Sequence, residues 1–188
     1  MEYQPDSMDW GDAYRLLIGG VQPRPIAWVS TLDPNGIANL APFSFFMGVC
    51  PRPFTLAFAP MRRGDAEPTD CKDTLRNLEA TRECVVNVVP EALAVQMNAT
   101  SGEYAADVDE FAIAGLTAAP SASVKPPRVA ESPINFECTV TQIVTLSEEA
   151  GGASLVILRA QHIHVADAVL DGHRIALDRI RPIGRLAG

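Results

Sequence analysis

Residues 24–46 read Arg-Pro-Ile-Ala-Trp-Val-Ser-Thr-Leu-Asp-Pro-Asn-Gly-Ile-Ala-Asn-Leu-Ala-Pro-Phe-Ser-Phe-Phe, and they predict a β-hairpin. Residues 26–31 form a run of β-branched and aromatic side chains, which is typical of a strand. Residues 32–36 supply the turn, because Pro presets φ and the Asn-Gly pair tolerates positive φ.

The returning arm, residues 37–46, is apolar but makes a poor strand. Asn39, Pro42 and Ser44 interrupt it, and a proline has no N–H to donate to a neighbouring strand. We therefore expect this arm to free backbone N–H and C=O groups that need other partners. A planar polar ligand would supply them.

The length and composition predict one folded domain, residues 1–188, in which residues 1–20 form a polar arm and a short helix. Apolar residues make up 47% of the chain, which argues against disorder. The longest apolar runs, residues 43–50 and 85–89, are too short to cross a bilayer. The first residues also lack the basic and apolar regions of a signal peptide, so we expect a cytoplasmic protein without a membrane partner.

The formal net charge of −8 argues against a nucleic-acid partner, because a phosphate backbone demands a basic face. A small anionic ligand remains compatible, since it needs only a few local cations. The four cysteines are widely spaced without a C-x-x-C motif, which argues against a structural zinc site. We interpret them as reduced thiols of a cytosolic protein.

Short strands, Pro- and Gly-rich turns and two or three helices predict a mainly β fold, an antiparallel barrel or sandwich with added helices. Residues 134–141 alternate in polarity, the phase slips at residues 142–144, which suggests a bulge, and residues 154–165 form the partner strand. A helix is expected over residues 74–81, capped by Asp73. No G-x-G-x-x-G follows a strand and no P-loop motif occurs, so neither nucleotide-binding motif is supported.

The tripeptide Lys72-Asp73-Thr74 at this helix start is a candidate phosphate site. Helix N-termini offer unpaired N–H groups and the positive end of the dipole, while Lys72 adds a cation and Thr74 a hydroxyl donor. An ordinary capped helix with a solvated lysine explains the tripeptide as well, and such helix starts are about three times commoner than phosphate sites.

The hairpin itself contains three candidate ligand contacts, Trp28, Ser30 and Thr31. The two hydroxyls lie at a strand end, although β-propensity also explains them. Trp28 can stack on a flat ring or serve as a core aromatic residue. Combined with the phosphate site, these contacts suit a planar heterocycle that carries a phosphate.

His162 and His164 share one face of a strand, a spacing that can hold a metal ion. No third ligand is apparent, and hydrogen-bonded strand histidines are roughly four times commoner than metal sites in this setting. No G-x-S-x-G motif and no nucleophile–base pair stand out either. We therefore predict no metal site and no catalytic side chain.

Several segments spread over nearly the whole chain carry a family resemblance. They are Arg-Pro-Ile-Ala-Trp-Val-Ser-Thr at 24–31, Asn-Leu-Ala-Pro-Phe-Ser-Phe-Phe at 39–46, Lys-Asp-Thr-Leu-Arg-Asn at 72–77, Val-Val-Asn at 85–87, Met-Asn-Ala-Thr-Ser at 97–101, Val-Asp-Glu-Phe at 108–111, Ala-Gly-Leu-Thr at 114–117, Lys-Pro-Pro-Arg-Val at 125–129 and Pro-Ile-Gly-Arg-Leu-Ala-Gly at 182–188. In this order they resemble the flavin reductase-like family of FMN-binding split β-barrels, which implies an antiparallel, Greek-key type barrel.

The resemblance also implies a set of FMN-binding residues. The segment around Asn39 to Ser44 would lie against the isoalloxazine ring, Ser30 and Thr31 near the ribityl chain or phosphate, and Lys72 to Thr74 at the phosphate. The residues expected to bind the cofactor are Trp28, Ser30, Thr31, Asn39, Leu40, Ala41, Pro42, Ser44, Lys72, Asp73, Thr74 and Arg185. Family members are usually homodimers with FMN near the interface, so a homodimer is expected here, with Phe43, Phe45, Phe46 and Met47 of the apolar arm at the contact.

Three functions are compatible with these features. The leading hypothesis is an NAD(P)H-dependent flavin reductase, in which hydride passes from the nicotinamide to flavin N5 and electrons continue to a monooxygenase or another acceptor. The second is a flavoredoxin-like electron-transfer protein whose FMN is reduced by a protein partner. The third is a barrel that has lost its flavin, and the retained segments 39–44 and 72–74 argue against it.

Overall fold

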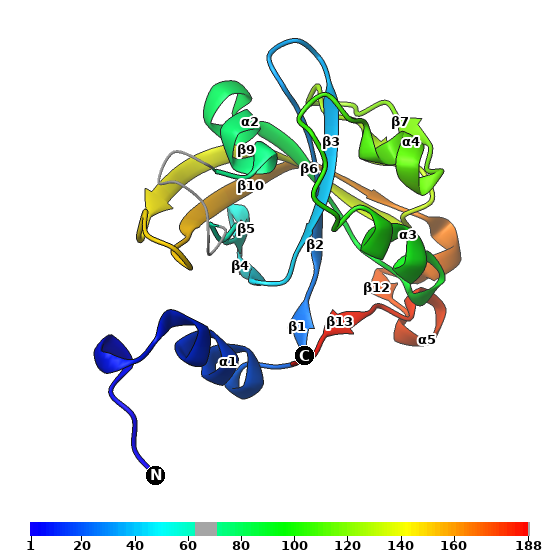
Figure 1. Cartoon of the computed structure of the whole chain (residues 1–188). Coiled ribbons are helices and arrows are strands. Elements are labelled where there is room, and N and C mark those ends of the chain that lie inside the picture. Colours follow the sequence, from blue (N-terminus) through cyan, green and yellow to red (C-terminus); the bar gives the residue numbers. More distant parts are fainter. Residues whose placement is uncertain (63–70, 188) are drawn as a thin grey trace.

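The computed structural model describes residues 1–62 and 71–187 (Figure 1). Its helices are η1 (Pro5–Ser7), α1 (Trp10–Gly20), α2 (Asp73–Thr81), η2 (Glu91–Leu93), α3 (Ala94–Ala99), α4 (Glu110–Ala114), η3 (Asp167–Val169) and α5 (Leu177–Ile180). Its strands are β1 (Arg24–Pro25), β2 (Ala27–Leu32), β3 (Ala38–Phe43), β4 (Phe46–Pro51), β5 (Phe54–Phe58), β6 (Glu83–Asn87), β7 (Ala118–Ala119), β8 (Arg128–Val129), β9 (Ile134–Thr145), β10 (Ser154–Val165), β11 (Leu170–Asp171), β12 (Arg174–Ile175) and β13 (Gly184–Arg185). No helix among these is long and apolar enough to span a membrane.

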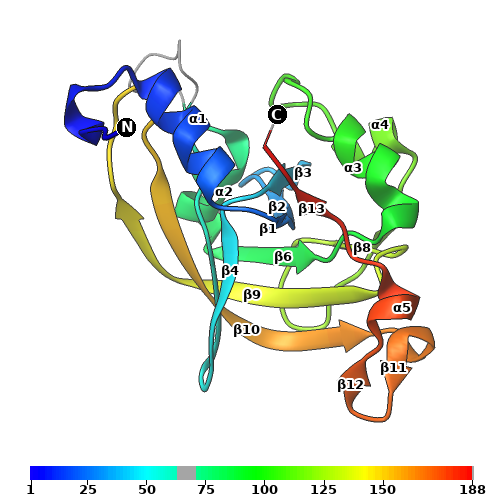
Figure 2. The same ribbon diagram turned by 90° about the horizontal axis from the view of Figure 1, so that it is seen from below.

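One sheet of seven strands organises the molecule, in the order β3-β2-β6-β9-β10-β5-β4. Every neighbouring pair in it is antiparallel. The long strands β9 and β10 run through its middle and curve strongly, as Figure 2 shows. This arrangement confirms the predicted antiparallel, mainly β fold with added helices.

The two edges of the sheet meet at one corner. Strands β3 and β4 lie at opposite edges, yet only Ser44 and Phe45 separate them in sequence. The N–H of Ala59, just after β5, donates to the carbonyl of Phe45 at 2.8 Å and holds this corner in place. The sheet is therefore closed here and open elsewhere, which is the geometry of a split barrel.

The hairpin of β2 and β3 is regular, so the expectation of a broken second arm is wrong. All six residues of β3 pair with β2, from Ala38 opposite Leu32 to Phe43 opposite Ala27. The N–H of Leu40 points away from β2. Alternate residues of an antiparallel strand face the same neighbour, so Pro42 also faces the free edge, where its missing N–H removes no ladder hydrogen bond.

The turn between β2 and β3 has the predicted chemistry. Asp33 accepts hydrogen bonds from the N–H groups of Asn35 at 2.8 Å and Ile37 at 2.7 Å. The hydrogen bond from Ile37 is the main reason that the pKa of the Asp33 carboxyl is lowered. Gly36 adopts φ +90°, a conformation that favours glycine.

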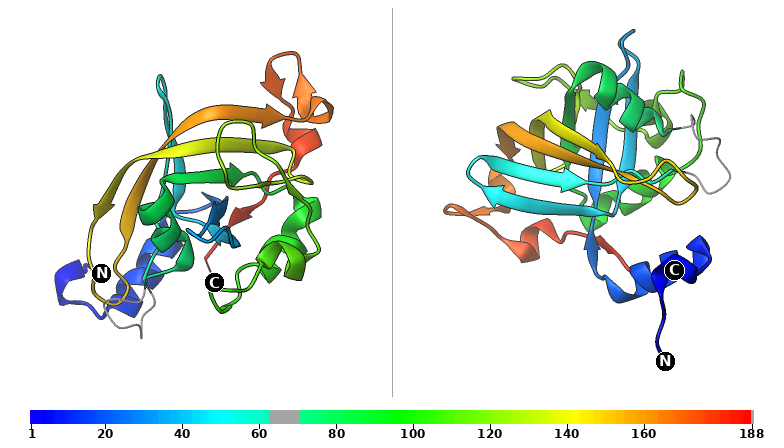
Figure 3. Two further views of the ribbon diagram at one scale, coloured as in Figure 1. Left: turned by 90° about the horizontal axis from the view of Figure 1, so that it is seen from above. Right: turned by 90° about the vertical axis from the view of Figure 1, so that its left-hand side faces the viewer.

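Strand β2 is buried on both faces and separates two apolar clusters. Val29 belongs to the cluster inside the barrel, which Leu75 and Leu78 of α2 cover. Trp28 belongs to a second cluster with Leu40, beneath α3 and α4. Figure 3 shows α2 and the pair α3–α4 on different sides of the hairpin. The hairpin is thus held from both sides.

Several predicted boundaries shift. The bulge expected at residues 142–144 lies at Thr141, and a second register shift occurs at Gln161. Helix α2 begins at Asp73 with Lys72 as its N-cap residue, so Asp73 is not the cap. These differences reflect pairing with distant strands, which local sequence does not encode.

Candidate cofactor-binding site

A cavity of about 630 Å³ lies beside the free edge of β3. Four parts of the chain supply most of its lining: β3 with Ser44, the start of α2, the end of α3 with the loop after it, and the C-terminal segment around β13. Ile26 and Glu110 of α4 complete it. In Figure 2 this C-terminal segment runs between β1 and α3. The volume is in the range of about 300–1,000 Å³ that small-molecule sites occupy.

The start of α2 forms one end of the cavity. The N–H groups of Leu75 and Arg76 donate to the carbonyl of Lys72 at 2.9 and 3.1 Å, and the amides of Asp73 and Thr74 precede these bonds. Such N-terminal amides lack intrahelical partners and lie at the positive end of the helix dipole, so they suit an anion. Lys72 is exposed at this point and adds a positive charge.

The carboxylate of Asp73 forms an ion pair with the guanidinium of Arg76. Asp73 occupies the first turn of α2, where a negative charge is favourable. The pairing offsets this negative charge next to the cavity.

A chain of buried hydrogen bonds joins α4, β3 and α2 behind the cavity wall. Asn39 donates from Nδ2 to Oε1 of Glu110 at 2.8 Å, and the N–H of Leu40 donates to Oε2 at 3.0 Å. The hydroxyl of Thr74 donates to Oδ1 of Asn39 at 2.7 Å. This places a carboxylate, an amide and a hydroxyl in fixed relative positions.

Glu110 is only 6% exposed although it lines the cavity. Burial raises the pKa of the Glu110 carboxyl, and the negative charge of Asp73 adds to this rise. The hydrogen bonds from Leu40 and Asn39 lower the pKa but do not outweigh burial. The site therefore contains a buried acid next to the end that suits an anion.

Most of the residues predicted to bind a cofactor come together at this cavity. Those that line it are Asn39, Ala41, Pro42, Ser44, Lys72, Asp73, Thr74 and Arg185. They come from β3, the start of α2 and β13, which the sequence separates widely. Their contact with a cofactor stays a prediction.

Four predicted residues do not line the cavity. Trp28 and Leu40 are fully buried in the core beneath α3 and α4. Ser30 donates to the carbonyl of Pro127 at 2.5 Å, and the hydroxyl of Thr31 accepts from Asn77 at 3.1 Å. All four side chains are enclosed by protein and lie outside the cavity lining.

The other lining residues were not predicted as cofactor contacts from the sequence. They are Ile26, Met97, Asn98, Thr100, Ser101, Gly102, Tyr104, Glu110, Ile183, Gly184, Leu186 and Ala187. Residues 97–101 and 108–111 contributed to the family resemblance without an assigned role. A glutamate after Asp109 at a helix start is the ordinary pattern of a first turn, so nothing local distinguished Glu110.

Arg24 holds the closed corner of the barrel beside the cavity. Its guanidinium is buried, donates to the carbonyls of Ile18 at 3.0 Å and Val21 at 3.2 Å, and contacts the hydroxyl of Ser44 at 3.3 Å. Arg24 also pairs through its backbone with Arg185 in β13. It thereby connects α1, the corner and the C-terminal segment.

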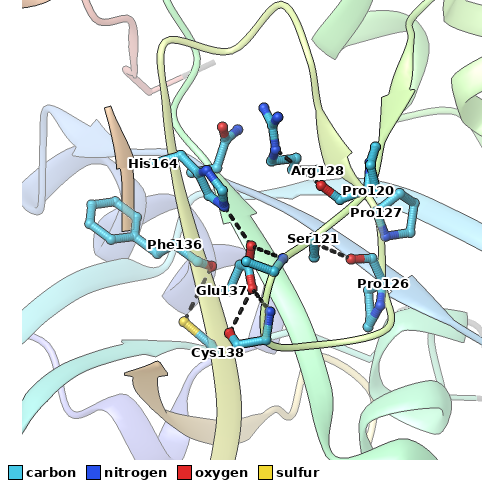
Figure 4. A network of polar contacts seen from close by, with 12 residues as sticks. Pro120, Ser121, Pro126, Pro127, Arg128, Phe136, Glu137, Cys138 and His164 are labelled. Atoms are coloured by element: carbon cyan, nitrogen blue, oxygen red, sulfur yellow. Dashed lines mark hydrogen bonds and ion pairs between the residues drawn. The ribbon is translucent and has the colours of Figure 1, made fainter. Parts of the chain in front are cut away.

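The two histidines lie outside the cavity lining. Nε2 of His164 is 2.5 Å from the carboxylate of Glu137, which also accepts from the N–H groups of Ala122 at 2.7 Å and Ser123 at 2.6 Å (Figure 4). The ring centroids of His162 and His164 lie 4.6 Å apart, with the two rings tilted by 48° to each other. Within residues 1–62 and 71–187, no three His, Cys, Asp or Glu side chains gather as a metal site would require.

Glu137 is fully buried and anchors the loop between β7 and β8 to the sheet (Figure 4). Burial alone raises its pKa, but the hydrogen bonds from Ser123, Ala122 and His164 outweigh burial and lower the pKa of Glu137 to about 2. Its partners are backbone and side-chain donors, so its role is to hold the loop.

Cys84 and Cys138 face each other in register on β6 and β9, and both are buried. Their mutual hydrogen bond and burial raise the pKa of Cys84 well above its usual value. Both remain free thiols, as does Cys71, whose pKa burial raises. They belong to the core and not to the cavity.

Comparison with known proteins agrees with this architecture. Residues 20–179 match the family model described as flavin reductase like domain. An uncharacterised protein of Aquifex aeolicus is 39% identical over 189 residues, which cover 100% of this chain and 93% of that protein.

Two solved structures are also similar over the whole chain. Nitrilotriacetate monooxygenase component B from Bacillus cereus has a TM-score of 0.92 at 30% identity, with 100% of this chain and 92% of that chain covered. The 2-nitrobenzoate 2-nitroreductase NbaA of Pseudomonas fluorescens has a TM-score of 0.86 at 28% identity, with 100% and 89% covered. The chain described here belongs to the flavin reductase-like family and has its split-barrel fold.

Proposed function

We propose that the cavity beside β3 binds FMN and that the protein is an NAD(P)H-dependent flavin reductase. One observation supports this most strongly: a single cavity joins the N-terminus of α2 to the free edge of β3. The first suits a phosphate and the second offers backbone groups to a polar ring edge.

The residues present fit FMN at both ends. Lys72 and the amides of Asp73 and Thr74 would hold the phosphate. The hydroxyl of Thr74 donates to Asn39, so its N–H is the donor that remains for a ligand. At the other end, Ala41 and Pro42 present small apolar side chains that suit a flat ring.

Bound FMN would supply a hydride acceptor, which the protein itself lacks. The protein residues bind and orient it and leave room in the cavity for a nicotinamide. The backbone carbonyls on the free edge of β3 would accept hydrogen bonds from the polar edge of the ring, since Glu110 already accepts from the N–H of Leu40 and Pro42 has no N–H. Hydride transfer needs no proton moved by a side chain, so no catalytic acid or base is proposed.

An electron-transfer protein that receives electrons from a protein partner is the second candidate. The sequence does not separate it from the first candidate, since a nicotinamide would need only to stack briefly on the flavin and does not require a G-x-G-x-x-G motif. The two candidates differ in one property, namely whether NADH or NADPH alone reduces bound flavin.

We further propose a cytoplasmic homodimer that passes electrons to a monooxygenase or another acceptor. Component B of a monooxygenase is similar in structure over the whole chain, which supports such an acceptor. Met47 and Val49 of β4 are 56% and 49% exposed, and Phe54 of β5 is 38% exposed, which supports an apolar contact between subunits. Phe43, which the sequence suggested for this contact, is buried in the barrel.

The reaction is tested by anaerobic stopped-flow mixing of the FMN-loaded protein with NADH and with NADPH. A flavin reductase loses its flavin absorbance with at least one nucleotide and no added protein. If neither nucleotide reduces the flavin while a reduced ferredoxin-type donor does, the electron-transfer candidate replaces the first.

A further inference from the structure

Glu110 places a buried negative charge beside the part of the cavity that suits an anion. It lines the cavity, and Asn39 links it to Thr74 at the start of α2. A negative charge close to an anion site disfavours the anion. If Glu110 favours the binding of an anion, it does so through the hydrogen bonds that it accepts and not through its charge.

Glu110 fixes which way the side chain of Asn39 points. An ionised carboxylate only accepts hydrogen bonds, so the amide must turn its Nδ2 donor toward Oε1 of Glu110, at 2.8 Å. The other oxygen, Oε2, accepts from the N–H of Leu40 at 3.0 Å. The amide oxygen of Asn39 is thereby directed toward α2.

The amide oxygen of Asn39 decides which groups at the start of α2 can still donate hydrogen bonds to a ligand. Oδ1 of Asn39 accepts from the hydroxyl of Thr74 at 2.7 Å and from that of Thr31 at 3.4 Å. A hydroxyl has one proton, so the side chain of Thr74 cannot donate to a ligand at the same time. Asn77 of α2 donates to the Thr31 hydroxyl at 3.1 Å, which adds a second tie between α2 and the hairpin.

We propose that Glu110 is a positioning residue for the phosphate end of the cofactor site. Through Asn39 it docks the first turn of α2 on β3, and it leaves backbone amides and Lys72 as the donors to the phosphate. This inference rests on the proposed FMN binding. It predicts that Glu110 matters for a flavin with a phosphate and not for one without.

The sign of the effect separates this role from simple electrostatics. In Glu110→Gln the introduced amide can accept from the N–H of Leu40 only when its NH₂ group faces Asn39. Asn39 then has to turn over, so that its Nδ2 faces the Thr74 hydroxyl and the hydrogen bond from Thr74 to Oδ1 is lost. Loss of charge alone would tighten FMN binding. Loss of positioning, in which the hydrogen bond from Thr74 to Asn39 disappears, loosens it by about tenfold.

A double variant restores the pattern with the same net charge. When Glu110→Gln is combined with Asn39→Asp, the introduced amide would accept from the N–H of Leu40 and donate to the introduced carboxylate. That carboxylate would still accept from the Thr74 hydroxyl. Glu131→Gln is the matched control, since Glu131 is exposed and accepts from the N–H of Thr117 at 3.0 Å, outside the cavity lining.

The experiment measures dissociation constants of FMN and riboflavin by fluorescence quenching for the parent and the three variants, with thermal unfolding of each. We expect Glu110→Gln to weaken FMN about tenfold while riboflavin stays within about twofold, and the double variant to recover most of the FMN affinity. Glu131→Gln should match the parent.

Unchanged or tighter FMN binding by folded Glu110→Gln overturns the proposal. So does an equal loss of FMN and riboflavin that the double variant does not rescue, because that outcome marks a merely structural role. If Glu110→Gln does not fold, the double variant decides: folding with FMN affinity near that of the parent supports the proposal, and failure to bind overturns it. A parent that binds no flavin refutes the proposed function itself, which is a separate outcome.

Discussion

The indole N–H of Trp28 donates to the hydroxyl of Thr100 at 2.9 Å, although 72 residues separate the two in sequence. Thr100 in turn donates to the carbonyl of Met97 at 2.8 Å. Trp28 is fully buried in β2, whereas Thr100 and Met97 line the cavity. The β2–β3 hairpin therefore supports the lining residues at the end of α3 as well as those of its own strand β3.

Replacing Trp28 by Phe should test this link. The substitution keeps an aromatic ring and removes the donor, so we expect a loss of about 1 kcal/mol in the free energy of unfolding and weaker FMN binding. Urea denaturation of Trp28→Phe, Thr100→Val and the double variant measures the coupling. If the two single losses simply add, the hydrogen bond does not contribute as described.

Lys72→Ala should weaken FMN binding about ten- to a hundredfold, since a charge-assisted contact to phosphate contributes about 1.5–3 kcal/mol. The reduction potential of the bound flavin should change much less, because the phosphate end is far from N5. Lys125→Ala is the control, since Lys125 lies outside the cavity lining. If Lys72→Ala binds FMN as tightly as the parent does, the proposed phosphate contact at the start of α2 is wrong.

Stability should fall at acidic pH because of Glu137. Its pKa is about 2 in the folded protein against the usual value of 4.5, so its contribution is fully present above pH 4.5 and is lost as the pH falls toward 2. Urea midpoints between about pH 7 and pH 3 measure this loss. Glu137→Gln should be less stable by about 2 kcal/mol at neutral pH and should lose less stability on acidification than the parent.

Glu131→Gln serves as the control for this pH series, because Glu131 is exposed. It should retain the pH dependence of the parent. A Glu137→Gln variant with the full acid-induced loss would show that other carboxyls cause it.

The two histidines should not take part in hydride transfer. His164 is hydrogen bonded to Glu137, the ring of His162 contacts that of His164, and neither histidine lines the cavity. We expect His162→Gln and His164→Gln to keep NAD(P)H-driven flavin reduction within a few-fold of the parent, while His164→Gln is less stable. A hundredfold slower reductive half-reaction with FMN bound would make this strand part of the active site.

The exposed apolar side chains of β4 should form a subunit contact. Met47→Asp combined with Val49→Lys places opposite charges on an edge strand without touching the core, since both residues are about half exposed. Light scattering should give a dimer mass for the parent and a monomer mass for this variant. A monomeric parent with FMN bound would contradict the contact.

The hairpin and the start of α2 could be predicted from the sequence because their signals are local. Turn chemistry at Asp33 to Gly36 indicates the hairpin, and Lys72 with its neighbours indicates a helix start. The rest of the site depends on contacts between residues that are distant in sequence, such as Asn39 with Glu110, 71 positions apart. No local pattern encodes such a pairing.

The error over Pro42 has the same origin. In sequence a proline within an apolar run argues against a strand. In the fold β3 is an edge strand and Pro42 faces its free side, a fact that depends on the order of all seven strands. Trp28 and Leu40 were likewise expected at the ligand because local sequence does not show that α3 and α4 cover that face.

The central claim, that this cavity binds FMN with its phosphate at α2, is tested most directly by titrating FMN and riboflavin with the purified protein and following flavin fluorescence. We predict quenching of FMN at micromolar protein and a dissociation constant about ten- to a hundredfold lower for FMN than for riboflavin. Absence of quenching would contradict flavin binding, and equal affinity for the two flavins would contradict a phosphate contact at α2.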